Sequence, residues 1–193
     1  DISCLAKEND KLWIGSNTYG TIQILNSNLK LIKTIDYPSF DRIIDIVFTN
    51  DHAYSIVLND NEYFIVRYLV DDMQYLDIID LVDGKINDIK VYNDHLYILT
   101  NGGYYKSPNI NDDNYLSLSQ GWDGPYYNEY DILSLEVISE DLIFVCFKDN
   151  EYYSIYNDHI HPLDNLNDEF INTYNIGNIL YLLSTKSLYI LNP

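Results

Sequence analysis

One segment of the chain concentrates side chains that suit a binding surface. Residues 120–130 read Gln-Gly-Trp-Asp-Gly-Pro-Tyr-Tyr-Asn-Glu-Tyr and hold one of only two tryptophans. Trp and Tyr present large rigid surfaces, and beside Asp and Asn they suit either the face of a sugar or a protein partner. We predict a binding loop here, with contacts from Trp122, Asp123, Tyr126, Tyr127 and Tyr130. The alternative is that Trp122 packs inside the fold and has only a structural role.

The histidines raise the question of metal binding. His159 and His161 are two residues apart, so on a strand they would face the same side and could share a metal ion. The sequence offers no clear third ligand, and His52 and His95 follow Asn-Asp turns, where we expect them to face solvent. The oxygen-rich stretch 109–114 lacks the Gly at its bend and the closing Glu of a calcium loop. We therefore predict no metal site and no cofactor.

Catalytic motifs are not evident either. The sequence contains no Gly-x-Ser-x-Gly elbow, no phosphate-cradling Gly loop and no His-Glu-x-x-His. Its 30 Asp and Glu residues are too numerous to pair by sequence alone, although a glycosidase needs two carboxylates at a defined separation in a cleft. We predict no catalytic residues and expect that the protein is not an enzyme.

The charge of the chain excludes some partners. Over 193 residues, 11 Lys and Arg oppose 30 Asp and Glu, which gives a net charge of -19. Binding to a phosphate backbone relies on Lys and Arg, so we exclude a nucleic-acid partner. No apolar run reaches the length of a membrane-spanning helix, so we expect no membrane insertion. An acidic surface favours solubility and could also attract a basic partner.

The elements that must position these residues are repeated strands. The chain has 20 Tyr but only two Ala, a composition that favours strands over helices. Five times, a short polar turn precedes an apolar strand, and those strands begin at Leu12, Ala53, Leu96, Leu142 and Leu180. The spacings between these residues are 41, 43, 46 and 38. Asn, Asp and Gly in the turns suit tight hairpins because they tolerate left-handed backbone angles.

Four strands can be assigned to each repeat unit, except to the last, which has three. A period of about 40 residues with four short strands is typical of a β-propeller blade. We predict an all-β fold, a β-propeller of four-stranded antiparallel blades in a single domain, with blades at 1–40, 41–84, 85–129, 130–168 and an incomplete one at 169–193. Either these blades close a ring, or they are part of a larger ring of about six to eight blades.

The first repeat unit carries a motif that points to a family. Leu12-Trp13-Ile14-Gly15-Ser16 is followed by Gly20 and the strand 21–25. The stretch from Ile2 to Leu25 resembles the propeller repeats of bacterial two-component-regulator sensor domains and of surface or secreted proteins, including ones exported by type IX secretion. The third unit is similar in outline, whereas Asp-Asn-Glu replaces the Gly turn at 60–62 and 149–151. The resemblance implies an extracellular or cell-surface bacterial protein and transfers no catalytic residue.

Three functional hypotheses follow. The first is a non-catalytic β-propeller module that mediates protein interaction or assembly, with another protein or further blades of the same protein as its partner. The second is a carbohydrate- or ligand-binding propeller that uses residues 120–130. The third is a polysaccharide lyase or hydrolase whose carboxylates meet in the central channel. Cys4 and Cys146 are expected to be small buried apolar residues, with a disulfide between them as the alternative.

Overall fold

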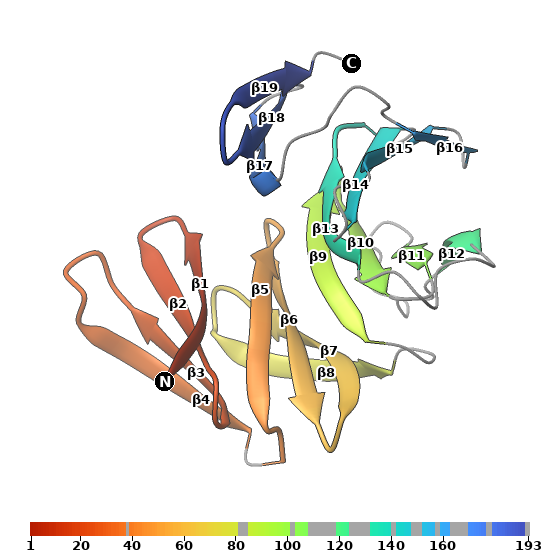
Figure 1. The fold of residues 1–193 in the computed structure, drawn as a ribbon. Coiled ribbons are helices and arrows are strands. Elements are labelled where there is room, and N and C mark those ends of the chain that lie inside the picture. The colour runs from red at the N-terminus through yellow and green to blue at the C-terminus, as the bar shows by residue number, and fades with distance from the viewer. Residues whose placement is uncertain are drawn as a thin grey trace. The chain divides into compact units, whose positions relative to one another are not determined.

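The computed structural model is all-β in the residues that it describes: 1–37, 39–80, 85–100, 103–107, 119–123, 132–139, 142–147, 152–156, 159–162, 170–176 and 179–191. Nineteen strands in these ranges form five antiparallel sheets, each from one contiguous stretch of chain (Figure 1). The chain divides into two compact units, Asp1–Ile89 and Lys90–Pro193. Among the described residues, no helix has the length and apolar character needed to cross a membrane.

The first unit holds two four-stranded sheets. The first sheet consists of β1 (Ile2–Glu8), β2 (Lys11–Ser16), β3 (Gly20–Leu25) and β4 (Leu31–Tyr37). The second consists of β5 (Arg42–Phe48), β6 (His52–Asn59), β7 (Glu62–Leu69) and β8 (Gln74–Asp80). In both sheets the strands follow one another in chain order. Strand β5 contacts β1, β2 and β3, so the two sheets pack face to face.

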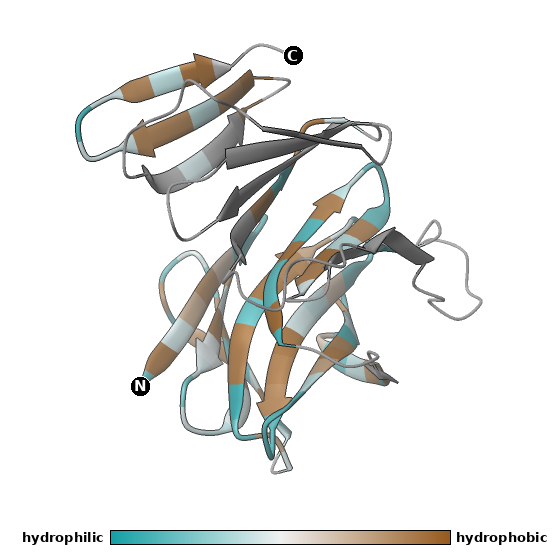
Figure 2. Ribbon diagram, turned by 45° about the vertical axis from the view of Figure 1, so that its right-hand side comes forward, coloured by the Kyte–Doolittle hydropathy of each residue, from teal (hydrophilic) through white to brown (hydrophobic). Residues whose placement is uncertain are grey.

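Alternating apolar residues build the core between these two sheets. Trp13, Ile22 and Ile24 are buried, while their neighbours along β2 and β3 are more exposed. This alternation appears as brown and pale bands along the strands in Figure 2, and it arises because successive side chains point to opposite faces of a sheet. From the second sheet, Ile43, Ile46, Ala53, Val57, Val66 and Tyr68 complete the same cluster.

The remaining strands form three further sheets. Strand β9 (Ile86–Tyr92) begins in the first unit and continues into the second, in a sheet with β10 (His95–Thr100), β11 (Gly103–Lys106) and β12 (Ser119–Asp123). The next sheet consists of β13 (Ile132–Val137), β14 (Leu142–Phe147), β15 (Tyr152–Tyr156) and β16 (His159–Pro162). The last has three described strands, β17 (Phe170–Ile176), β18 (Ile179–Ser184) and β19 (Leu188–Leu191).

The hairpin turns explain much of the Asn and Asp content. Asn93 and Asp94 join β9 to β10 with φ values of 45° and 58°. Asp60 and Asn61 join β6 to β7 with φ values of 49° and 68°, so both take the left-handed conformation that Asn and Asp tolerate better than most residues. The turn before β6 differs, because the backbone N–H of Thr49 donates to the carbonyl oxygen of His52 across 2.8 Å.

The predicted fold class, all-β with four-stranded antiparallel sheets in sequence order, is therefore confirmed. The repeat period arises from one sheet per unit, and the last unit contributes three described strands. Whether the whole chain forms a single domain stays a prediction.

Candidate interaction surfaces

The first strand of a sheet carries an irregularity that recurs along the chain. Strands β1, β5, β13 and β17 each have a break in register near their start. The residues that directly follow the break all have small polar or sulfur-containing side chains, namely Cys4, Asp45, Ser134 and Asn172. At each break one residue without a partner in the register stands just before this side chain, namely Ser3, Ile44, Leu133 and Ile171, and an extra residue of this kind bends a strand and interrupts its ladder.

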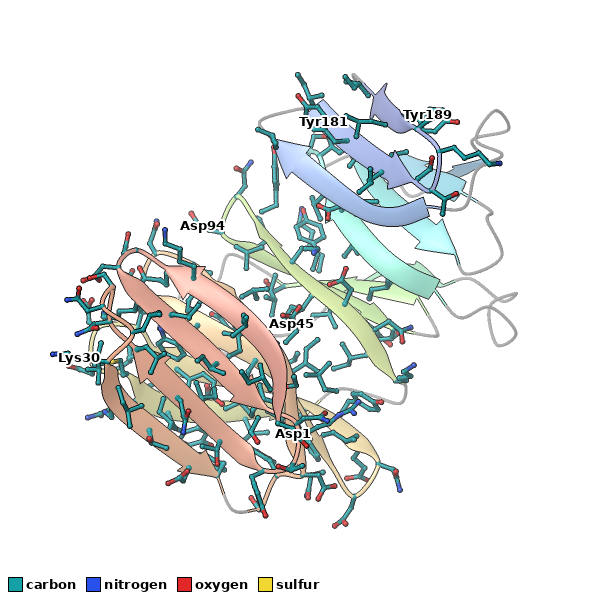
Figure 3. All side chains as sticks on the ribbon, turned by 60° about the vertical axis from the view of Figure 1, so that its left-hand side comes forward. Asp1, Lys30, Asp45, Asp94, Tyr181 and Tyr189 are labelled. Carbon is teal, nitrogen blue, oxygen red and sulfur yellow. The ribbon has the colours of Figure 1, made fainter. Side chains whose placement is uncertain are left out.

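Two aspartates in the first strands of their sheets, Asp45 in β5 and Asp88 in β9, bond to the backbone locally. Asp45, labelled in Figure 3, accepts a hydrogen bond from the backbone N–H of Ile46 across 2.8 Å. Asp88 in β9 accepts the same bond from Ile89, also across 2.8 Å. Short polar side chains satisfy local backbone donors in this way wherever the ladder is interrupted. The carboxylate of Asp45 therefore has a structural partner directly after the break in β5.

Cys4 occupies the same place in the first sheet. It is a free thiol and half-buried. Burial raises its pKa to about 11, and the charge of Asp45 acts in the same direction. Since the thiolate is the nucleophile, a thiol that stays protonated at neutral pH is a poor one.

Aromatic residues fill the space between the first two sheets. The ring of Trp13 contacts Phe48 and Tyr68 edge-on, with centroid distances of 5.4 and 6.2 Å. The Tyr68 hydroxyl lies 3.0 Å from Ser55 Oγ in a buried hydrogen bond. Burial raises the pKa of Tyr68, so the phenol stays neutral. Trp13 is thus a core residue, as its place in the repeat suggests, and this cluster stabilises the pair of sheets.

Exposed and half-buried apolar side chains gather on the outer face of the first sheet, beside the polar residues Lys7 and Gln23. We call the residues Ile2, Leu5, Leu12, Ile14 and Leu25 the leading face; they lie on the side of the sheet opposite Trp13. Ile2 and Leu5 are 62% and 60% exposed, and the other three are half-buried. Figure 3 views the first sheet from this side, with the second sheet behind it. Exposed apolar patches on a protein surface mark sites of association with other molecules.

The last sheet also has an uncovered apolar face. We call the residues Tyr181, Leu183, Leu188 and Ile190 of β18 and β19 the trailing face. Leu188 and Ile190 are 57% and 56% exposed, whereas Leu180 and Leu182 on the other face of β18 are buried. Tyr181 is labelled in Figure 3. The trailing face therefore has the same aliphatic character as the leading face.

The predicted binding loop is partly a strand. Residues 119–123 form β12, so Trp122 and Asp123 lie in a sheet and not in a loop, which corrects our expectation. The register places Trp122 opposite Tyr104 and Asp123 opposite Gly103. Tyr126, Tyr127 and Tyr130 lie outside the described residues. The structure does not bring the five residues together as a described site, and a binding role for them stays a prediction.

The histidines occupy places in strands. His52 and His95 begin β6 and β10 and are half-buried, where we expected them to face solvent. His95 Nδ1 donates to the carbonyl oxygen of Ser107 across 2.7 Å. His159 and His161 lie two residues apart on β16, as predicted. Within the part of the chain that is described, no group of three His, Cys, Asp or Glu side chains is placed to hold a metal ion.

The leading and trailing faces were not found from the sequence. The available signal was the alignment of the repeat, because Ile2 and Leu5 stand where Ile43 and Ile46 stand in the next unit. That signal marks the positions as apolar. It does not say which of them has a neighbouring sheet to cover it.

Comparison with known proteins gives the fold. No protein-family model and no curated protein sequence matches the chain. Among solved structures, it is similar to the extracellular domain of a putative hybrid two-component system from B. thetaiotaomicron, with a TM-score of 0.75 and 15% identity over 99% of this chain and 27% of that one. BamB from Moraxella catarrhalis gives a TM-score of 0.67 and 14% identity over 96% of this chain and 55% of that one.

An enzyme also has a similar structure. Virginiamycin B lyase from Staphylococcus aureus gives a TM-score of 0.72 and 11% identity over 99% of this chain and 69% of that one. The chain spans about half of the BamB chain and about a quarter of the sensor chain. These similarities show that the chain has a β-propeller fold. The predicted resemblance to sensor propellers is supported as far as the fold, and the link to type IX secretion stays a prediction.

Proposed function

We propose that this chain is a non-catalytic β-propeller module that mediates protein interaction or assembly, outside the cytoplasm, at a bacterial cell surface or in the envelope. The observation that carries the proposal is the leading face of the first sheet. Two of its side chains, Ile2 and Leu5, are exposed on a chain whose net charge of -19 otherwise favours contact with water. Burial of such side chains in a protein interface is favourable by about 25 cal/mol per Å².

The similar structures support this proposal without deciding it. One is an extracellular domain of a putative two-component system, and another is a lyase. Because one fold hosts many activities, function has to be argued from a site. The leading face offers surface for packing and no nucleophile or acid–base pair, so it favours association over catalysis.

Site-specific cross-linking tests the proposal. A photoreactive amino acid replaces Leu5 on the leading face, or Asn28 in the exposed turn between β3 and β4 as the matched control. In the cells that produce the chain, we expect irradiation to join position 5 to a protein and position 28 to give little or no adduct. Equal labelling at both positions, or none at position 5, would contradict an interaction through this face.

The catalytic alternative needs its own assay. The purified chain is incubated with virginiamycin B and with a panel of polysaccharides, and the products are followed by mass spectrometry. We expect no turnover. Cleavage of any of these substrates would replace the proposal with an enzymatic function.

A further inference from the structure

Two tyrosines meet at the boundary between the first two sheets. Tyr37 is the last residue of β4, and Tyr75 lies in β8. Both rings pack against the core that the two sheets share, and both belong to the compact unit Asp1–Ile89. Their ring centroids are 4.7 Å apart, with the ring planes tilted by 49°. At this distance two aromatic rings from different sheets are in direct contact.

The hydroxyl groups of the two tyrosines also lie side by side. Burial raises the pKa of the Tyr37 phenol, and its hydrogen bond to Tyr75 acts in the same direction. A hydrogen bond raises the pKa of a phenol when the phenol donates it, because the bond then stabilises the protonated form. Tyr37 therefore donates to the hydroxyl oxygen of Tyr75, and this bond brings the Cε carbons that flank the two hydroxyls close together.

Neighbouring side chains hold the two rings in place. Phe40 stacks on Tyr37, with a centroid distance of 4.9 Å and an interplanar angle of 16°. Tyr68 lies edge-on to Tyr75 at 6.5 Å, but its own hydroxyl is buried in a hydrogen bond with Ser55 Oγ. Tyr37 and Tyr75 are only half-buried. Solvent therefore reaches this pair, while Tyr68 is the less suitable partner for Tyr75.

We propose that Tyr37 and Tyr75 form a site of oxidative cross-linking, at which a dityrosine bond joins the first sheet to the second. A one-electron oxidant takes one electron from each phenol, and each phenol releases its proton, which leaves two tyrosyl radicals. The radicals pair as a bond between one Cε of each ring. Each of these carbons then loses its hydrogen as a proton, and each phenolic oxygen takes one up. In balance the pair loses two electrons and two protons, and two equivalents of oxidant are reduced.

The geometry selects this pair from the 20 tyrosines of the chain. Radicals on different copies must meet by diffusion, whereas groups that are held in contact react with a high effective concentration. The fraction of chain linked between Tyr37 and Tyr75 should therefore not depend on protein concentration. This site is independent of the proposed function, because it uses neither the leading face nor a partner protein.

Photo-oxidation of the purified chain tests the site. The probe is ruthenium tris-bipyridyl with persulfate under visible light, which generates a one-electron oxidant in solution. We expect dityrosine fluorescence in the monomeric product on a denaturing gel. Mass spectrometry of a protease digest should find the peptides that contain Tyr37 and Tyr75 joined, with the loss of two hydrogen atoms. The linked chain should also unfold at a higher urea concentration, because the bond constrains the unfolded state as a disulfide does.

Phenylalanine variants identify the reacting residues. Tyr37→Phe and Tyr75→Phe should each lower the yield of intramolecular dityrosine at least about tenfold, because phenylalanine forms no phenoxyl radical and the oriented pair is lost. Tyr19→Phe is the matched control, since it removes a phenol of the same chemistry that is 70% exposed. It should leave the yield unchanged. Circular dichroism verifies that each variant folds.

The wild-type chain decides the outcome even if a variant does not fold. Oxidation in concentrated urea, where the two sheets are separated, should abolish the link between Tyr37 and Tyr75. A link that persists in urea overturns the inference, since the fold would then not select the pair. It is also overturned if wild type gives no dityrosine, if the links join only different copies, or if Tyr75 is joined to Tyr68 instead.

Discussion

At the scale of single residues, the break in register near the start of a first strand lies beside two side chains that could pass for functional ones, Cys4 in β1 and Asp45 in β5. Asp45 and Asp88 each accept a hydrogen bond from the next backbone N–H. Cys4 stands at the equivalent place with a pKa raised by burial. A carboxylate that accepts a hydrogen bond from the neighbouring backbone N–H has a structural role. The repeat thus uses short polar residues where the ladder is interrupted.

The contact between Gly15 and Cys4 gives a stability prediction. A Cβ at Gly15 would lie 2.5 Å from Cys4 Sγ and 2.9 Å from Ile43 Cγ2. We expect Gly15→Ala to lower the free energy of unfolding by about 1–3 kcal/mol because the core is overpacked. Cys4→Ala should restore part of that loss, with a coupling of at least about 0.5 kcal/mol in a double-mutant cycle measured in urea.

Gly20 provides the control for that cycle. A Cβ there would meet the carbonyl oxygen of Tyr37 and the Cβ of Phe40, and not Cys4. Cys4→Ala should therefore leave the cost of Gly20→Ala unchanged. Equal rescue of both glycine variants would show that Cys4→Ala acts generally and not through the contact with Gly15.

We predict that the free energy of unfolding falls in alkali, because burial raises the pKa of two acidic side chains, Cys4 and Tyr54. Burial raises the pKa of Cys4 from 9.0 to about 11 and that of Tyr54 from 10.0 to about 12, although Arg67 opposes the second shift. Above pH 9 the unfolded chain loses protons that the folded chain keeps, so the free energy of unfolding falls as pH rises toward 12. Below pH 9 this contribution is fully present.

Urea unfolding between pH 7 and pH 12 measures the effect. Tyr54→Phe should make the decline above pH 10 shallower, by up to about 1.4 kcal/mol per pH unit. The exposed Tyr19→Phe is the control. A decline that is the same in wild type and the Tyr54 variant would contradict the assignment.

At the scale of elements, the turns follow the rules of hairpin chemistry, and their types differ from unit to unit. Asp60-Asn61 has positive φ at both positions, the geometry for which Asn-Gly is preferred. Replacement of this pair by Asn-Gly should raise the free energy of unfolding by about 0.5 kcal/mol.

The control is Asp51→Gly. The φ angle of Asp51 is not positive, so Gly at this position only adds conformational freedom to the unfolded chain. Stabilisation by both changes would contradict the turn assignment.

The strand β12 shows where sequence patterns are insufficient. We expected residues 120–130 to form a loop because they lie between the strands that begin at Leu96 and Leu142, which are 46 residues apart, the longest spacing in the repeat. The strand nevertheless extends from Ser119 to Asp123, and its register shifts between the partners of Tyr104 and Tyr105, which leaves Gly121 as the extra residue. Whether β12 contains a bulge depends on how it pairs with β11, and not on the local conformational preference of its residues.

At the scale of the whole molecule, the excess of negative charge predicts sensitivity to salt. Repulsion within a chain at -19 opposes the compact state at low ionic strength. The thermal midpoint at pH 7 should therefore rise when sodium chloride screens that repulsion. Near the isoelectric point of about 4.1 the rise should disappear. A midpoint at pH 7 that falls with added salt would show that attractive ion pairs outweigh the repulsion.

The fold class was determined by the sequence itself. Turn residues, strand alternation and the repeat of about 40 residues are local properties, and they predict four-stranded sheets without knowledge of any distant contact. Each of these inferences depends on residues that are close together in the chain.

Which apolar faces are covered was decided only by the tertiary structure. Leu5 and Ile46 are equivalent in the repeat, yet Leu5 is exposed and Ile46 is buried. Ile190 and Ile24 differ in the same way. The physical reason is that burial is a property of a side chain together with its neighbours, and a repeat pattern specifies the side chain but not whether another sheet lies against it.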